Sequence, residues 1–471
     1  MIKFGTGGWR AIIGEDFTKA NLQTLCGAVA KKMLDENCGD LGIVIGYDRR
    51  FLSDFSAKWA AEIFASYKIR CMIIEGESPT PMIMFAVKKY KCHYGMAITA
   101  SHNPAWYNGI KVFAKGGRDA DMEVTESIEE YIKNYSEPPC VKSFDEALKI
   151  GLIKYIRPRN DYIDSIIDSV NMEAIRAKNL RIIIDPMYGV SKTSLQTIFL
   201  TARCDVDVIH ERHDTLFGGR LPSPGAKTLN ALKAYVSESK ADIGIATDGD
   251  ADRIGVIDDS GNFLHPNTIL VLLYYYLMKY KGWSGPVVRN TATTHLLDKI
   301  AESRGEKCYE VPVGFKHISS KMLETNAIIG GESSGGLTVK GHIQGKDGIY
   351  AAALLVEMIA VTGISLSKIF KEITDEFGEH HLVELDFSFS QEKKEELTNL
   401  LYKQKKLPRF PLEIENVSYI DGCKVCFKNG GWIICRFSGT EPLIRVFCET
   451  DSIEMSENTT KIMTGFLGLD I

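Results

Sequence analysis

A repeated alternation of strand and helix is the feature that most constrains how this chain can fold. In each unit a short apolar strand ends in a loop that contains Gly or Asp, and an amphipathic helix follows. Three such units have strands predicted over residues 42–46, 180–184 and 286–290, with helices over 53–67, from 191 and from 293. Strands that alternate with helices form α/β units with mostly parallel sheets. The repetition indicates related domains in series.

The pattern changes after about residue 377. A strand is predicted over 381–389, a charged helix over 391–403, and two strands on either side of Asn429-Gly430, a dipeptide typical of hairpin turns. A chain of 471 residues is also too long for one hydrophobic core. The predicted fold class is therefore α/β, with three related mixed α/β domains in series plus a smaller C-terminal α+β domain.

Polar and proline-containing stretches mark the predicted domain boundaries. They occur at residues 136–140 and 155–160, and a turn at 258–262 leads toward a third unit. The predicted domains are residues 1–150, 151–258, 259–372 and 373–471.

Composition excludes several classes of protein. The longest apolar run, residues 269–278, is too short to cross a bilayer and is predicted to be a buried helix, so no membrane partner is expected. Eleven cysteines without a disulfide framework, and no signal-peptide pattern, indicate a cytoplasmic protein. The net charge of −5 argues against nucleic acid as a partner. An anionic substrate would therefore need a local basic cluster.

A candidate nucleophile lies directly after a predicted strand over residues 95–98. The loop that follows, Thr-Ala-Ser-His-Asn-Pro, contains Ser101 and His102 at a strand end, where α/β folds place chemistry. The Ser101 hydroxyl could accept and return a phosphoryl group with support from His102. A hairpin over 107–111 would return Lys111 to this position, to assist proton transfer or neutralise phosphate charge. Taken alone, the segment also fits an ordinary turn.

Three carboxylates follow another predicted strand, over residues 242–246. Asp248, Asp250 and Asp252 occupy alternate positions of one loop and would repel one another unless a cation lay between them. Hard oxygen ligands suit Mg²⁺. Arg253, the next residue, could hold a phosphate or orient one Asp. A solvated acidic turn is the remaining alternative.

A calcium EF-hand is a weaker explanation of the same loop. The three Asp fit its first three ligand positions, and Asp259 falls at the twelfth. However, Arg253 occupies the position that requires Gly, and the flanking segments are predicted strands rather than helices.

Glycine-rich loops supply further candidate binding residues. Residues 330–336 contain Glu332 and Ser334, whose oxygens suit sugar hydroxyls, while the glycines permit close backbone approach. Upstream, Lys316 follows a predicted strand. At the N-terminus, the loop over 4–10 ends in Arg10 and fits neither the dinucleotide-binding nor the Walker pattern. Taken alone, the loop over 330–336 also fits a flexible turn.

A stronger anion-binding pattern lies near the C-terminus. Two arginines, two hydroxyls and glycine amides would form a phosphate cradle. The residues are Arg436, Ser438, Gly439, Thr440 and Arg445. A plain loop with a surface arginine pair is the alternative. Four nearby cysteines (423, 426, 435 and 448) are interpreted as buried small residues rather than zinc ligands, because their surroundings are predicted strands.

Together these segments resemble the α-D-phosphohexomutase superfamily of phosphoglucomutases and phosphomannomutases. The resemblance covers essentially the whole chain, with the motifs in the family's order. Residues 99–104 resemble its phosphoserine loop, 248–253 its magnesium loop, 331–335 its sugar-recognition loop and 436–442 its phosphate-binding loop. The resemblance implies phosphoserine, metal-binding, sugar-binding and phosphate-binding domains, in that order, around a central cleft.

The resemblance also implies a role for each candidate residue. Ser101 would be the phosphoserine, and Asp248, Asp250 and Asp252 would bind Mg²⁺ together with its phosphate. Arg10, His102 and Lys111 match catalytic positions near the transferring phosphate. The substrate would be held by Arg253, Lys316, Glu332, Ser334, Arg436, Ser438, Gly439, Thr440 and Arg445.

The implied activity is an isomerase reaction. It would interconvert glucose 1-phosphate and glucose 6-phosphate in the cytoplasm, with Mg²⁺ and with glucose 1,6-bisphosphate as activator and intermediate. A mobile fourth domain is expected to close over the sugar phosphate, and the chain is expected to be a monomer or a dimer.

The sequence departs from the family at two positions, of which Phe437 is expected to matter little to the anion site and Gly336 bears on the substrate. Phe437 replaces a Pro common among relatives, and Gly336 stands where mannose/glucose enzymes carry His, which leaves the epimer preference open. The alternatives are a phosphomannomutase or phosphoglucosamine mutase, a non-catalytic phosphosugar-binding protein, and a phosphatase that hydrolyses phospho-Ser101.

Overall fold

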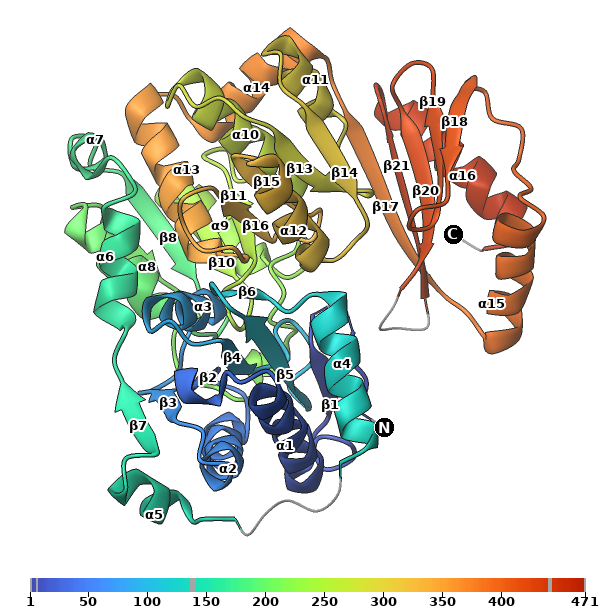
Figure 1. Cartoon of the computed structure of the whole chain (residues 1–471). Helices are drawn as coiled ribbons and strands as arrows, with labels where there is room; N and C mark the ends of the chain where they lie inside the picture. The colour runs from blue at the N-terminus through green and yellow to red at the C-terminus, as the bar shows by residue number, and fades with distance from the viewer. Residues whose placement is uncertain (1, 6, 136–140, 439–442, 470–471) are drawn as a thin grey trace.

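Four β-sheets follow one another along the chain (Figure 1). The computed structural model describes residues 2–5, 7–135, 141–438 and 443–469. Each of the first three sheets has parallel strands that continue to one edge and antiparallel strands at the other edge, and the fourth sheet is antiparallel throughout. The predicted fold class is thereby confirmed.

The first sheet has the strand order β1-β5-β4-β2-β3-β7, and β6 pairs with β5. Its strands are β1 (Trp9–Ile12), β2 (Ile43–Tyr47), β3 (Cys71–Ile74), β4 (Tyr94–Ile98), β5 (Tyr107–Ala114), β6 (Arg118–Asp119) and β7 (Ile153–Ile156). Its helices are α1 (Lys19–Asp35), α2 (Ser53–Ser66), α3 (Thr80–Lys89), α4 (Met122–Lys133) and α5 (Phe144–Lys149), with a 3₁₀ turn η1 (Gly39–Leu41). Because β7 pairs with β3, this sheet continues past the boundary predicted at residue 150.

The second sheet has the order β12-β11-β10-β8-β9. Its strands are β8 (Arg181–Asp185), β9 (Asp205–Val208), β10 (Ile243–Thr247), β11 (Ile254–Ile257) and β12 (Phe263–Leu264). The helices of this part of the chain are α6 (Arg159–Ile167), α7 (Met172–Arg176), α8 (Lys192–Thr201) and α9 (Asn230–Ser239), with a 3₁₀ turn η2 (Phe217–Gly219).

The third sheet has the order β14-β13-β15-β16. Its strands are β13 (Val287–Asn290), β14 (Cys308–Val311), β15 (Ile329–Gly331) and β16 (Leu337–Val339). The helices are α10 (Pro266–Lys279), α11 (Leu296–Ser303), α12 (Phe315–Thr325), α13 (Gly348–Thr362) and α14 (Leu366–Phe377). The helix predicted from residue 293 begins only at Leu296. Its predicted first turn is instead a loop, in which the Asn290 side chain accepts hydrogen bonds from Ala292 N and Thr293 Oγ1.

The fourth sheet has the order β17-β21-β20-β19-β18. Its strands are β17 (His381–Ser388), β18 (Ile414–Ser418), β19 (Cys423–Phe427), β20 (Trp432–Phe437) and β21 (Leu443–Thr450). The helices are α15 (Gln391–Thr398), a π-helical turn η3 (Asn399–Lys403) and α16 (Ile453–Leu467).

The packing joins the first three units more closely than the fourth. One continuous buried cluster runs from the first sheet (Val44) through the second (Ile184) to the third (Val287). The fourth sheet has a core of its own that includes Val425, and a small cluster that contains Ala292 connects it to the third unit. The C-terminal unit is therefore the part that can move with the least loss of buried contact.

Helix α13 is buried along almost its whole length, because it packs against the second sheet on one side and against α10 and β16 on the other. Across the residues that the structure describes, no single helix reaches the length and apolarity of a membrane span. Helices α13 and α14 have that length and apolarity only when they are taken together, and a bend of 80° separates them.

Candidate active site

Loops from all four units converge on one cleft with a volume of about 570 Å³. β4, β10 and β15, one from each of the first three sheets, lead at their carboxyl ends into the serine, acidic and glycine-rich loops of this site, where α/β sheets place binding loops. Nine of the predicted site residues line the cleft: Arg10, His102, Lys111, Arg253, Glu332, Ser334, Arg436, Ser438 and Arg445. Lys316, on the first turn of α12, lines a small adjoining cavity that shares Lys111 with the cleft. Gly439 and Thr440 lie outside the described residues.

Ser101 is completely buried, and its hydroxyl contacts the acidic loop of the second unit. Its Oγ donates a hydrogen bond of 2.6 Å to Asp248 Oδ2, and His102 Nδ1 lies 3.4 Å from the same hydroxyl. The backbone of Ser101 has φ of 52°, a left-handed conformation that is uncommon for residues other than Gly. Its amide is held by Thr99 Oγ1 at 2.8 Å. This strained backbone conformation directs the Ser101 hydroxyl toward the carboxylates.

Arg50 holds the serine loop in that conformation. Its guanidinium donates to the carbonyl oxygens of Ser101 and Asn103 at 2.6 Å, Pro104 at 2.8 Å and Tyr107 at 3.0 Å. Four carbonyls on one buried, planar donor group fix the loop from within.

Asp48 connects Arg50 to the strand that precedes the loop. Its Oδ2 lies 3.4 Å from Arg50 Nε and accepts a hydrogen bond of 2.6 Å from Thr99 Oγ1. The predicted serine site therefore has an ionic support at the end of β2.

The three carboxylates form a compact, buried group whose ligand oxygens lie within 4.8 Å of one another. Lys111 Nζ donates to Oδ2 of Asp250 and of Asp252, at 2.6 Å in each case. The Oδ1 atoms of Asp250 and Asp252 are buried without a hydrogen-bond partner. Orphaned buried oxygens are costly unless a cation takes them. The donor set and the orphaned atoms thus fit a hard divalent ion such as Mg²⁺.

The ionisation of the triad supports the same conclusion. Burial, followed by the charges of Asp250 and Asp252, raises the pKa of Asp248 well above its usual range. Burial opposes the positive charge of Lys111, but the two carboxylates outweigh it and raise the pKa of that amine. Lys111, joined at Asp252 by Lys346, lowers the pKa of Asp250 and of Asp252 despite their burial. Asp248 is therefore the carboxylate that a bound cation would allow to ionise as well.

Basic groups surround His102 on the cleft side. Burial, and then the charges of Arg253 and Arg10, hold the pKa of His102 well below its usual value, so that the imidazole is neutral near pH 7. Burial also lowers the pKa of Arg10 to about 10, which leaves it charged. Arg10 Nη1 donates to Asn103 Oδ1 at 2.6 Å and so contacts the serine loop directly.

The glycine-rich loop after β15 packs against the acidic loop. Glu332 is buried, with Oε1 accepting from Gly314 N at 3.0 Å and Oε2 facing Ser334 Oγ at 3.4 Å. Gly336 pairs with Arg253 through an isolated bridge. A Cβ added at Gly336 would lie 2.2 Å from Lys346 Cδ, so any larger residue here would have to displace that lysine.

The fourth unit contributes Arg436 at the end of β20. Its Nε donates to both oxygens of Asp421 at 2.9 Å, and Asp421 Oδ2 also accepts from Val313 N at 2.7 Å. Asp421 thus connects the third and fourth units across the cleft. Arg445 Nε lies 3.6 Å from Asp386 Oδ1 on the neighbouring strand.

Five residues that support the site were not identified from the sequence: Asp48, Arg50, Thr80, Lys346 and Asp421. Thr80 Oγ1 donates to Asp250 Oδ2 at 2.5 Å, and Lys346 Nζ lies 2.9 Å from Asp252 Oδ2. Asp48 and Arg50 have a local signal, since Asp48-Arg-Arg50 directly follows a strand end. The other three reach the site only through contacts between units.

The rival metal interpretations find no support. The acidic loop is flanked by β10 and β11, strands rather than the helices of an EF-hand. Within the described part of the chain, two groups of side chains could hold a metal ion, and the four C-terminal cysteines belong to neither.

Comparison with known proteins places four consecutive family signatures along the chain. Those described as phosphoglucomutase/phosphomannomutase, alpha/beta/alpha domains I, II and III match residues 1–139, 160–261 and 265–377. The C-terminal domain of the same description matches residues 392–459.

Relatives of the same kind align over nearly the full chain. A phosphoglucomutase/phosphomannomutase from Thermococcus kodakarensis is 30% identical, covering 96% of this chain and 95% of that protein. A probable phosphoglucosamine mutase from Pyrococcus furiosus is 31% identical, with coverages of 98% and 97%. A crystal structure of a Thermus thermophilus protein described as a phosphomannomutase superimposes with a TM-score of 0.86 at 28% identity, covering 99% of both chains.

Proposed function

This chain belongs to the phosphoglucomutase/phosphomannomutase family, the α-D-phosphohexomutase superfamily, and from that premise we propose that it interconverts glucose 1-phosphate and glucose 6-phosphate. The single observation that carries the proposal is the placement of Ser101. Its buried hydroxyl oxygen lies 2.6 Å from Asp248, one of the three carboxylates that fit a divalent cation. The cleft above it is lined by basic groups from all four units.

The proposed reaction passes through a phosphoserine. Phospho-Ser101 gives its phosphoryl group to the free hydroxyl of a hexose monophosphate, whose proton leaves to a neighbouring base. The P–O bond to Ser101 breaks as the new P–O bond forms, and a hexose 1,6-bisphosphate results. After the bisphosphate turns around, Ser101 takes the other phosphoryl group. Such transfers depend on in-line positioning and charge neutralisation.

Each group of cleft residues has a task in this scheme. Asp248, Asp250 and Asp252 would hold Mg²⁺, which when bound supplies positive charge beside the transferring phosphate. Neutral His102 can accept or return a proton, and Arg10 and Lys111 neutralise charge around the reacting oxygens.

The rest of the cleft would hold the substrate. Glu332 and Ser334 can accept and donate hydrogen bonds to sugar hydroxyls. Arg436, Ser438 and Arg445, with the predicted Gly439 and Thr440, would bind the phosphate that does not react. Arg253 and Lys316 would complete the contacts with the substrate. The proposal also places the protein in the cytoplasm and has glucose 1,6-bisphosphate phosphorylate Ser101 for the first turnover.

A phosphoglucosamine or phosphomannose substrate is the second candidate. It is favoured by the names of relatives at about the same identity, which include both activities. Gly336, which lies against the cleft residue Lys346, is the position that bears on this choice, because the resemblance places a His there in mannose/glucose enzymes.

A coupled assay tests the proposal. Glucose 1-phosphate would be incubated with Mg²⁺ and a trace of glucose 1,6-bisphosphate, with mannose 1-phosphate and glucosamine 1-phosphate in parallel. We expect glucose 6-phosphate to form, turnover to stop with EDTA, and the Ser101→Ala variant to be inactive. Preferential turnover of another sugar would select the second candidate. Release of inorganic phosphate without isomerisation would indicate a phosphatase, and no turnover despite phosphorylated Ser101 would indicate a binding protein.

A further inference from the structure

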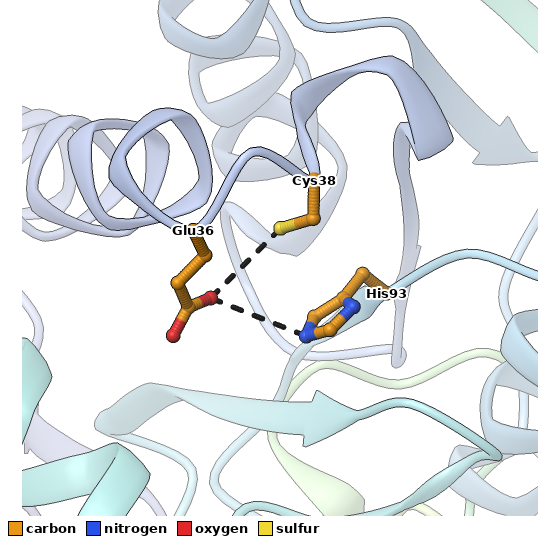
Figure 2. Close-up of side chains that lie close together, drawn as sticks. All are labelled: Glu36, Cys38 and His93. Atoms are coloured by element: carbon orange, nitrogen blue, oxygen red, sulfur yellow. Dashed lines mark hydrogen bonds and ion pairs between the residues drawn. The ribbon is translucent and has the colours of Figure 1, made fainter.

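A second cluster of metal-binding side chains lies at the opposite end of β4 from Ser101. Figure 2 shows its three members, Glu36, Cys38 and His93, pointing toward one another. Glu36 follows the last residue of α1, Cys38 precedes the 3₁₀ turn η1, and His93 immediately precedes β4. The end of one helix and the start of a strand far along the sequence thus bring a carboxylate, a thiol and an imidazole together.

We propose that Glu36, Cys38 and His93 bind a divalent transition-metal ion of the Zn²⁺ class, with water as the fourth ligand. Glu36 Oε2 lies 3.8 Å from Cys38 Sγ and 4.0 Å from His93 Nε2, and all three ligand atoms lie within 4.8 Å of one another. Ordinary zinc bond lengths in a tetrahedron require ligand atoms about 3.3–3.6 Å apart. Small side-chain rotations would bring the three ligand atoms from their present separations to these shorter distances.

The groups around the cluster hold the carboxylate in place. Lys32 Nζ lies 2.7 Å from Glu36 Oε1, and the Tyr94 hydroxyl donates to Oε2 at 2.8 Å. Although burial opposes it, these hydrogen bonds lower the pKa of Glu36, which keeps the ligand ionised. Neighbouring donors of this kind orient metal ligands in known sites.

The protonation states of His93 and Cys38 affect how tightly this site should bind a metal ion. Burial lowers the pKa of His93, so its imidazole is neutral and has a nitrogen lone pair available. Burial and the charge of Glu36 raise the pKa of Cys38 to about 11, and its thiol donates to Met33 O at 3.3 Å. The metal must therefore displace a proton and tolerate the nearby charge of Lys32, which weakens binding.

The cluster differs chemically from the aspartate triad. Sulfur and nitrogen donors select zinc-like ions, whereas the all-oxygen triad suits Mg²⁺. A metal here would fasten the end of α1 to the beginning of β4, the strand whose other end leads into Ser101. Its effect would be on stability, since none of its ligands lines the cleft.

Cobalt titration of the full-length protein tests this site. Co²⁺ bound to a thiolate gives an intense near-ultraviolet charge-transfer band that oxygen ligands at the triad do not produce. We expect the band to saturate at one thiolate-bound Co²⁺ per chain, and Zn²⁺ to abolish it by displacement. Cys38→Ser should remove the band, and His93→Asn should weaken binding by at least about tenfold.

Matched variants separate this site from other thiols and histidines. Cys426→Ser removes a partly exposed cysteine outside the cluster, and His213→Asn removes a histidine that pairs with Glu77 and belongs to neither metal-binding group of the described residues. Both should leave the titration unchanged. Cys38→Ser should keep Mg²⁺-dependent turnover and lose only the rise in melting temperature produced by Zn²⁺. A band that persists in Cys38→Ser, or that is absent from the unaltered protein, would overturn the proposal whatever the mutase assay shows.

Discussion

Arg50 shows how much of the candidate site depends on one side chain that does not line the cleft. It is buried, and its guanidinium contacts four carbonyl groups of the serine loop while lying close to Asp48. A lysine could keep the charge but not the planar set of donors. The loop would then lose its fixed conformation, although the charge beside Asp48 would remain.

We therefore expect Arg50→Lys to lower kcat by about 100-fold, because small misplacements of a reacting group have costs of that size. KM should change little, since the substrate contacts remain. Steady-state kinetics check this, with Arg70→Lys as control, because Arg70 is an exposed arginine that also donates to a carbonyl, that of Asp40. Equal kinetics for the two variants would contradict the role given to Arg50.

Gly336 and Lys346 form a second residue-scale test. A methyl group at residue 336 would overlap the stem of Lys346 and push its amine away from Asp252. Gly336→Ala and Lys346→Ala should each lower kcat/KM by about tenfold, and the double variant should be no worse than either, because both changes remove the same contact. Additive losses in the double-mutant cycle would show that the two positions act separately.

At the scale of elements, the acidic loop between β10 and β11 is expected to be a stabilising metal site. Mg²⁺ at 100 times its dissociation constant would stabilise the folded protein by about 2.7 kcal/mol. The melting temperature should rise with Mg²⁺ and fall with EDTA, and Asp250→Asn should reduce that response. Asp259→Asn, on the turn after β11, is the control that should retain it. A melting temperature insensitive to Mg²⁺ would count against the site.

The sequence predicts elements and strand-end loops well, because both depend on local patterns. β2, β8 and β13 lie within one residue of their predicted positions, and the serine and aspartate loops follow strands as expected. The charged helix predicted over 391–403 divides into α15 and the π-helical turn. Contacts between units cannot be predicted in this way, because they do not depend on local sequence patterns. Thr80, Lys346 and Asp421 have ordinary local surroundings, and only tertiary packing brings them to the cleft.

At the scale of the whole molecule, the fourth unit is joined to the others by few buried groups. Lys424 reaches from β19 to donate to Thr291 O at 2.9 Å, and Glu449 accepts from His295 N at 2.9 Å. Near the cleft, Asp421 connects Val313 with Arg436. A phosphate that bound Arg436 would compete with Asp421 for the guanidinium. Substrate binding and the orientation of the fourth unit are therefore expected to be coupled.

Binding of glucose 1,6-bisphosphate should accordingly make the molecule more compact, as measured by small-angle X-ray scattering. The bisphosphate can bridge the basic groups near Ser101 and those of the fourth unit, and the small interface permits rotation. Arg436→Ala should raise KM by about tenfold or more and abolish the compaction, because it removes one anchor of that bridge. Arg409→Ala, an exposed arginine on the same unit, should behave as the unaltered protein does. Superimposable scattering profiles with and without ligand would show that the fourth unit does not close.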